Sequence, residues 1–258
     1  MNVGGDRRPA AADEIDRQQD RPSFYALAPG GWRDYWTLLH PPYTLWHLSY
    51  VALGAAVAPA FNWARLWWSL LGFFLGMGIT AHCLDELNGR PLRTRIPSAV
   101  LKGLAVAGVA GAVALGVMGA IQVSAWLLVF VAFGGFIVVA YNLELFGGAF
   151  HGDGWFAASW GAFPALTAAF AQDGVLRWPA VAVTAACMIL SLTQRVLSTP
   201  VRRLRRSIVA VEGRLVLNDG STEPLDASSL RSAPERALRL LSMAMPLLSV
   251  AAVTARML

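Results

Sequence analysis

The sequence predicts an all-α integral membrane protein, and three observations support this prediction. Of the 258 residues, 56% are hydrophobic and only 14% are charged, whereas soluble domains carry about 25% charged residues. The apolar residues form long runs, and a run of about 18 or more indicates a transmembrane helix. Basic residues are concentrated in alternate loops, as in multi-pass membrane proteins. These features exclude an ordinary soluble enzyme, a disordered chain and a disulfide-rich secreted domain.

The apolar runs predict a bundle of about seven transmembrane helices. The first follows Pro41-Pro42, because proline is tolerated at the start of a helix. Small residues recur at every fourth position of the third run, which favours close packing of helices. We expect the spans near residues 44–62, 65–84, 98–120, 123–141, 155–171, 178–198 and 238–257.

The remaining segments are polar or carry turn signals. Acids and arginines mix between Asp6 and Arg21, which is typical of disorder. Asn218-Asp219-Gly220 predicts a small β-hairpin, and Ala233-Pro234-Glu235 predicts the start of the last helix. We divide the chain into a disordered and interfacial segment (1–40), a transmembrane bundle with a cytoplasmic-facing cavity (41–206), a cytoplasmic hairpin loop (207–234) and the last transmembrane helix (235–258).

The distribution of basic residues predicts an orientation. The net charge of +5 is the balance of 20 arginines and the single Lys102 against 16 acidic residues. In a membrane protein this charge bears on orientation and lipid headgroups rather than on nucleic acid. Arginines gather at 90–95 and 202–206, whereas the opposite loops offer Arg65 and Arg177. We therefore expect a cytoplasmic N-terminus, the plasma membrane of a prokaryote and no nucleic-acid partner.

The end of the second predicted helix carries the densest group of polar residues. His82 and Glu86 are four residues apart and share one helix face, with Asp85 beside them. Ionisable residues at such a position are candidates for a functional site, although a helix end in lipid headgroups also tolerates acids and bases. Asn88, Arg90 and Arg93 follow directly.

A second polar group follows the fourth predicted helix. Tyr141 opens a loop that contains Glu144, His151 and Asp153, and these carboxylates and this imidazole are of metal-binding type. His47, inside the first predicted helix, is either a ligand or a satisfied interior histidine. A third group, Arg195 and Arg202 at the end of the sixth helix, falls on the same side of the membrane.

Residues 38 to 206 resemble the UbiA superfamily of intramembrane prenyltransferases. The resemblance rests on the helix start at Pro41-Pro42-Tyr43-Thr44, the polar end of the second helix, the loop opened by Tyr141 and the segment Trp160-Gly161-Ala162-Phe163-Pro164. It implies a bundle of about nine helices around a cavity. It also implies binding of a prenyl diphosphate through Mg²⁺ held by two Asp-rich motifs, followed by prenyl transfer or cyclisation.

The chain departs from this pattern in its acids. The asparagine and three aspartates of the first motif fall on Leu84, Asp85, Asn88 and Leu92, so one aspartate remains. The place of the second motif, Thr193 to Arg202, contains no acid. Arginine binds phosphate without a metal, so we expect a divergent member that acts on an isoprenoid diphosphate or a lipid phosphate.

Two alternatives remain open: a non-catalytic lipid-binding or partner protein on the same fold, and a membrane enzyme with a transition metal held by histidines and carboxylates. The resemblance implies Mg²⁺ as the first-choice cofactor and a membrane lipid or isoprenoid as the substrate. We assign catalysis to Asp85, Glu86, Tyr141 and Glu144, substrate binding to Asn88, Arg90, Arg93, Arg195, Arg202, His47 and Trp160, and metal binding to Asp85, Glu86, His82, His151 and Asp153.

Overall fold

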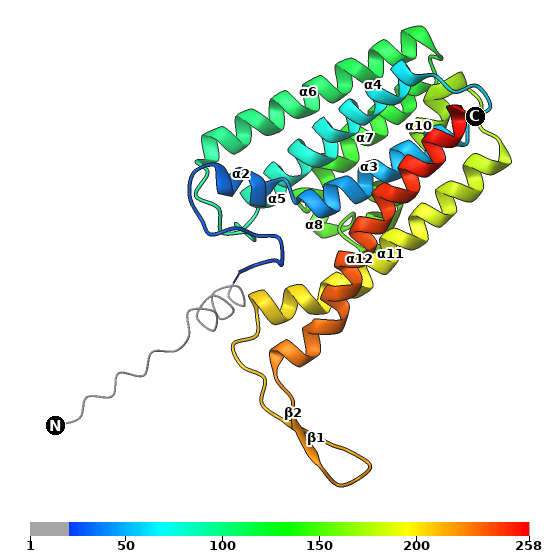
Figure 1. Cartoon of the computed structure of the whole chain (residues 1–258). Helices are drawn as coiled ribbons and strands as arrows, with labels where there is room; N and C mark the ends of the chain where they lie inside the picture. The colour runs from blue at the N-terminus through cyan, green and yellow to red at the C-terminus, as the bar shows by residue number, and fades with distance from the viewer. Residues whose placement is uncertain (1–20, 258) are drawn as a thin grey trace.

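The computed structural model describes residues 21–257, which form a helical bundle with one small hairpin (Figure 1). The tail expected to be disordered lies for the most part outside the described residues. In chain order the elements are α2 (Trp32–Leu38), α3 (Pro41–Ala56), α4 (Trp63–Phe73), the π-helix η1 (Phe74–Ala81), α5 (His82–Leu87), α6 (Ser98–Gln122), α7 (Leu127–Asn142), α8 (Leu145–Gly148), α9 (Asp153–Phe156), the π-helix η2 (Ala157–Ala162), α10 (Phe163–Asp173), α11 (Trp178–Arg206), β1 (Arg214–Val216), β2 (Thr222–Pro224), α12 (Ala227–Thr254) and the 3₁₀ helix η3 (Ala255–Met257).

Four helices of the described region are long and apolar enough to cross a membrane: Trp63–Leu87, Ser98–Gln122, Trp178–Arg206 and Ala227–Met257. A helix of 25 residues is about 38 Å long, and the hydrocarbon core of a bilayer is about 30 Å thick. The chain is therefore mostly helical with four candidate spans, which indicates a multi-pass membrane protein.

The expectation of about seven spans is not met. The run expected at 44–62 forms α3, which ends at Ala56 after 16 residues, and α7 has the same length. Sixteen residues extend about 24 Å, less than the hydrocarbon core. The run expected at 155–171 passes through α9, η2 and α10, and it is not among the candidate spans.

α3 lies inside the bundle. It packs against α10 and α12, and its Trp46 and Tyr50 side chains are fully buried. The Trp46 indole donates a hydrogen bond to the Tyr50 hydroxyl at 2.5 Å. Protein rather than lipid therefore surrounds this helix.

The hairpin prediction is confirmed, whereas the start of the last helix is corrected. β1 and β2 pair antiparallel around the predicted turn, where Gly220 has a φ of 82°. The hairpin extends away from the bundle (Figure 1). α12 begins at Ala227 and continues through Pro234, because Asp226 and Ser229 form a reciprocal capping box at an earlier position.

The close contact between α3 and α10 gives a stability prediction. A Cβ atom added at Gly54 would lie 2.0 Å from the Ala165 carbonyl oxygen, so Gly54→Ala must push two backbones apart. We expect a loss of about 1–3 kcal/mol in the free energy of unfolding, measured as a lower melting temperature in detergent. Gly103→Ala is the matched control, because nothing lies within 4 Å of its added Cβ. Equal melting temperatures for both variants would contradict the close contact.

Candidate functional site: an arginine cluster beside an apolar cavity

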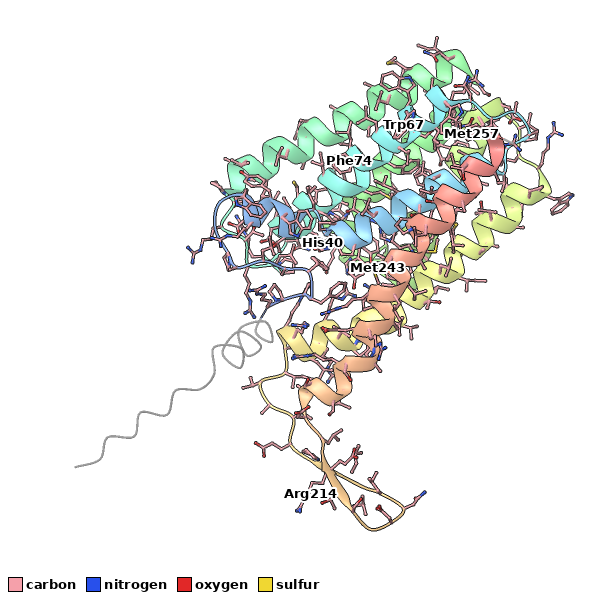
Figure 2. The ribbon with its side chains drawn as sticks, in the orientation of Figure 1. His40, Trp67, Phe74, Arg214, Met243 and Met257 are labelled. Carbon is pink, nitrogen blue, oxygen red and sulfur yellow. The ribbon has the colours of Figure 1, made fainter. Side chains whose placement is uncertain are left out.

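Segments that are far apart in the sequence lie at the end of the bundle that carries α2, α5 and α8 (Figure 1). His40, which directly precedes α3, lies near this end, whereas Arg214 of the hairpin lies well apart from the bundle (Figure 2). We call the central group the arginine cluster. It consists of Arg195, Arg202 and Arg206 from α11, Asp85 from α5, Tyr141 from α7 and Tyr25 from the N-terminal segment.

Helix α11 presents the three arginines on one face. Arg195, Arg202 and Arg206 are separated by seven and four residues, and these intervals return to the same side of an α-helix. The charges of Arg195 and Arg206 both act on Arg202. Asp85 lies within the electrostatic influence of Arg202 and Arg206. The cluster therefore places Arg202 and Arg206 near Asp85, whereas Arg195 pairs with Asp153.

The arginines differ in how their charge is compensated. Arg195 donates from two nitrogens to one Asp153 oxygen, at 2.7 Å each, but the Asp153 side chain is 61% exposed. Water weakens an ion pair of that kind. Within residues 21–257, Arg202 has no acidic hydrogen-bond partner and reaches Thr199 Oγ1 at 3.5 Å. Arg202 therefore carries the least compensated charge of the three.

Residues 21–26 lie against the end of α11 and supply neutral partners to Arg206. Its guanidinium donates to the Pro22 carbonyl at 3.2 Å and to Ser23 Oγ at 3.4 Å. The neighbouring Arg205 pairs with Glu235 and donates to the Arg21 carbonyl. The first described residues of the segment are thus packed on the end of the bundle.

Tyr25 connects this segment to two stacked histidines. Its hydroxyl lies 2.8 Å from His40 Nδ1, and the rings of His40 and His82 stack at 4.2 Å with an interplanar angle of 11°. Burial raises the pKa of Tyr25 to about 12. Burial also lowers the pKa of His40 well below its usual range, and the charges of His82 and Arg206 add to this effect. At neutral pH a phenol therefore donates to an uncharged imidazole.

Glu86 has a structural role that the sequence analysis did not predict. Its side chain is fully buried. One oxygen accepts from Leu92 N at 3.0 Å, and the other accepts from Thr94 N and Thr94 Oγ1 at 2.9 and 2.8 Å. Both oxygens of Glu86 thus hold the loop after α5. We therefore assign Glu86 a structural role in place of the predicted catalytic and metal-binding roles.

Three of the predicted substrate-binding residues lie in the same loop after α5. Arg90 donates to the Ile96 carbonyl at 2.6 Å and to Ser98 Oγ at 2.7 Å. Arg93 is exposed. Asn88 donates to the Asn142 carbonyl at 3.3 Å. The structure therefore uses Arg90 and Asn88 to fix backbone, and it brings none of the three into the arginine cluster.

The predicted metal ligands do not gather in the described region. Glu144 is exposed at a position with a φ of 50°. His82 donates from Nδ1 to the Gly78 carbonyl, and His151 donates from Nδ1 to the Tyr141 carbonyl. Between residues 21 and 257 no three side chains of His, Cys, Asp or Glu are grouped so that they could hold a metal. The described residues therefore do not support the metal site that the enzyme with histidine and carboxylate ligands would need.

The Mg²⁺ expectation meets the same obstacle. Diphosphate binding through several magnesium ions needs several carboxylates around the phosphates. Asp85 is the carboxylate near the arginine cluster that could serve as a metal ligand, because Glu86 holds a loop and Asp153 pairs with Arg195. This donor set does not fit the magnesium sites that the resemblance implies, so no step is derived through a metal.

An aromatic wall adjoins the arginine cluster. The Tyr141 and Trp160 rings lie 4.4 Å apart, and Phe156 stacks on Trp160 at 5.7 Å. Arg195 lies over the Phe156 ring at 5.3 Å. The predicted residue His47 lies 5.8 Å from the same ring, and its Nε2 is 2.9 Å from Gln194 Oε1. His47 is thus an interior histidine with a hydrogen-bond partner.

A second feature is an apolar cavity of about 180 Å³ that Trp160 helps to line. It runs along α4 and η1 from Arg65 to Met77, a distance of about 18 Å for twelve helical residues. Ser159 and Trp160 line it, and Met77, Tyr141 and Trp160 belong to one buried cluster. Glycines open space for it between the helices: Gly72, Gly76, Gly116, Gly119, Gly134 and Gly135.

Some functional candidates were missed by the sequence analysis. Arg206 was read as part of a lipid-facing basic run, although its four-residue spacing from Arg202 could have identified it. Tyr25 and His40 carry no local signal, because their contacts depend on how residues 21–40 fold back onto the bundle.

Comparison with protein-family models, curated proteins and solved structures gives no match to this chain. The resemblance to the UbiA superfamily therefore stays an expectation from the sequence.

The bonding of Glu86 predicts a large effect on stability. In Glu86→Gln, an NH2 group replaces one carboxylate oxygen. This group cannot accept a hydrogen bond, so a buried backbone N–H of the loop loses its partner. We expect the variant to unfold with about 1–3 kcal/mol less free energy, measured by thermal unfolding in detergent. Glu144→Gln, at an exposed position, should unfold like the wild type. A Glu86→Gln protein of unchanged stability that has lost ligand binding would restore a site role.

Proposed function

We propose that this protein binds the phosphate head of an anionic lipid, of the isoprenoid phosphate or diphosphate type, at the arginine cluster. The observation that carries the proposal is the imbalance of three guanidinium groups against two carboxylates, Asp85 and the exposed Asp153, at the end of an apolar bundle. Buried charges need partners. An anionic head would supply the acidic hydrogen-bond partner that Arg202 lacks within residues 21–257.

The ligand class follows from what adjoins the arginines. Guanidinium groups bind phosphate through paired, charge-assisted hydrogen bonds and need no metal to do so. The neighbouring rings of Tyr141, Phe156 and Trp160 offer an apolar surface to the first part of a hydrocarbon chain. A small soluble phosphate would leave this aromatic wall unused, so an amphipathic ligand fits better.

The reaction we propose is of the prenyl-transfer or cyclisation type. The bond between the first carbon and the diphosphate oxygen breaks, and its electron pair stays on the diphosphate, where the arginines stabilise the charge. The aromatic faces stabilise the allylic cation. The acceptor then forms the new bond and loses a proton, and we assign Asp85 as the group that receives it.

Non-catalytic lipid binding is the second candidate, and a specific observation favours it. Asp85 is the one carboxylate near the arginine cluster, among the described residues, that is not already committed to another contact or exposed, since Asp153 pairs with Arg195, Glu86 holds a loop and Glu144 is exposed. Such a site would retain the lipid without turning it over. In both cases we propose that the arginine-rich end faces the cytoplasm of a prokaryotic cell, on the positive-inside rule.

Arg202→Gln tests the binding site. With farnesyl diphosphate as the probe and the protein in detergent, we expect the dissociation constant to rise about tenfold or more, because a hydrogen bond to a charged group is lost. Arg203→Gln is the control, since Arg203 is exposed on the same helix. A chelator of divalent cations should not change binding to the wild type. Equal affinities of the two variants would contradict the proposed site.

Asp85→Asn separates turnover from binding. We expect it to retain farnesyl diphosphate but to release diphosphate about 10²-fold more slowly than the wild type, the usual effect of losing a catalytic proton acceptor. Glu144→Gln serves as the exposed control. An unchanged rate in Asp85→Asn would remove the assigned role of Asp85, and a wild type that binds but releases nothing would favour the non-catalytic candidate.

A further inference from the structure

Helix α2 presents an aromatic face that the described residues 21–257 leave uncovered. Trp32, Tyr35 and Trp36 share one side of the helix, because residues three and four apart lie on the same face. Their side chains are 70%, 42% and 45% exposed, whereas Asp34 and Leu38 are buried. Three large aromatic side chains exposed together indicate an interaction surface rather than part of the core.

The buried side of α2 fixes the helix to the loop that leads into α6. One carboxylate oxygen of Asp34 accepts from Gly30 N at 3.0 Å, and the other accepts from Arg95 N at 3.1 Å. Thr37 Oγ1 accepts from Leu27 N at 3.0 Å. Because these bonds hold the polar side of α2 against the protein, its aromatic face is directed outward.

The same loop presents two arginines beside this face. Leu92 and Thr94 are buried, whereas Arg93 and Arg95 are exposed. The Glu86 carboxylate accepts from the N–H groups of Leu92 and Thr94 at 3.0 and 2.9 Å. This buried acid therefore holds the backbone of the loop and leaves the two guanidinium groups at the surface.

Arg33 of α2 adds a third basic side chain. It is exposed, and its Nε donates to the Gly30 carbonyl at 3.4 Å. Within residues 21–257 no ion pair joins Arg33, Arg93 or Arg95 to an acid. We call the six exposed side chains the α2 surface: Trp32, Arg33, Tyr35, Trp36, Arg93 and Arg95.

The start of α6 places the α2 surface relative to a bilayer. α6 is a candidate span of 25 residues and is about 38 Å long, so it exceeds the hydrocarbon core of about 30 Å and its ends reach the headgroups. Arg95 precedes the first residue of α6, Ser98, by three positions, which is at most about 11 Å of chain. Figure 1 shows α2 beside α5 at the end where α6 begins. The α2 surface therefore lies close to the headgroup layer.

We propose that the α2 surface binds the headgroups of anionic phospholipids in the bilayer around the protein. Tryptophan and tyrosine side chains favour the boundary between membrane and water, and arginines at this level attract anionic headgroups. The aromatic residues thus hold α2 in the interface, and the arginines select the charge of the lipid. This surface is separate from the arginine cluster, and the inference does not rest on the proposed function.

The test measures which lipid lies next to α2. A fluorophore is attached to Tyr35→Cys in the full-length protein, whose own Cys83 and Cys187 are buried. The protein is placed in vesicles of phosphatidylcholine and phosphatidylglycerol, and one lipid or the other carries a nitroxide quencher near its headgroup. At equal mole fraction we expect phosphatidylglycerol to quench about fivefold more effectively, because a basic residue near an anionic surface favours association by about this factor. Equal quenching by both lipids, or a fluorophore that neither lipid quenches, would overturn the proposal.

The arginines are tested by combining Arg33→Gln, Arg93→Gln and Arg95→Gln. The fluorophore should still be quenched, because the aromatic residues remain, but the preference for phosphatidylglycerol should be lost. The melting temperature should not change, since the three side chains are exposed. A preference that survives in this variant would refute the proposal.

Trp126→Cys is the matched control site. Trp126 is 71% exposed at the start of α7, and residues 121–132 contain no charged side chain. A fluorophore at this position should be quenched equally by both lipids, and a preference as large as that at Tyr35→Cys would contradict selection by the α2 surface. Arg202→Gln should leave the preference at Tyr35→Cys unchanged, so the outcome is independent of the arginine cluster.

Discussion

The three arginines of α11 impose the main electrostatic constraint on this structure. A guanidinium group removed from water needs compensating partners, and each neighbouring segment supplies some of them. Asp153 pairs with Arg195, and residues 21–26 give carbonyl and hydroxyl groups to Arg206. Arg202 receives the least, although it lies between the other two in the sequence. The position of the N-terminal segment and the start of α9 are both tied to this group of charges.

The arginine cluster and the apolar cavity differ in their chemistry. The cluster is charged, whereas the cavity is lined mostly by apolar residues. Trp160 lines the cavity and packs on Tyr141, whose hydroxyl lies in the field of Arg195 and Arg202.

Features set by neighbouring residues could be predicted from the sequence, and features set by distant contacts could not. The turn at Asn218-Asp219-Gly220 and the polar end of the second apolar run both follow from local patterns. The burial of α3 depends on its packing against α10 and α12, and the role of Glu86 depends on a loop that folds back onto it. Pro234 was misread as a helix start, because the capping box at Asp226 sets the start earlier.

The measurement that tests the central claim most directly is native mass spectrometry of the detergent-purified protein, with lipid and phosphate analysis of the same sample. The account predicts a copurified lipid that carries phosphate, present in the wild type and lost when Arg195→Gln, Arg202→Gln and Arg206→Gln are combined. A variant that keeps this lipid, or a wild type that retains neutral lipid alone, would contradict an anionic-lipid site at the arginine cluster.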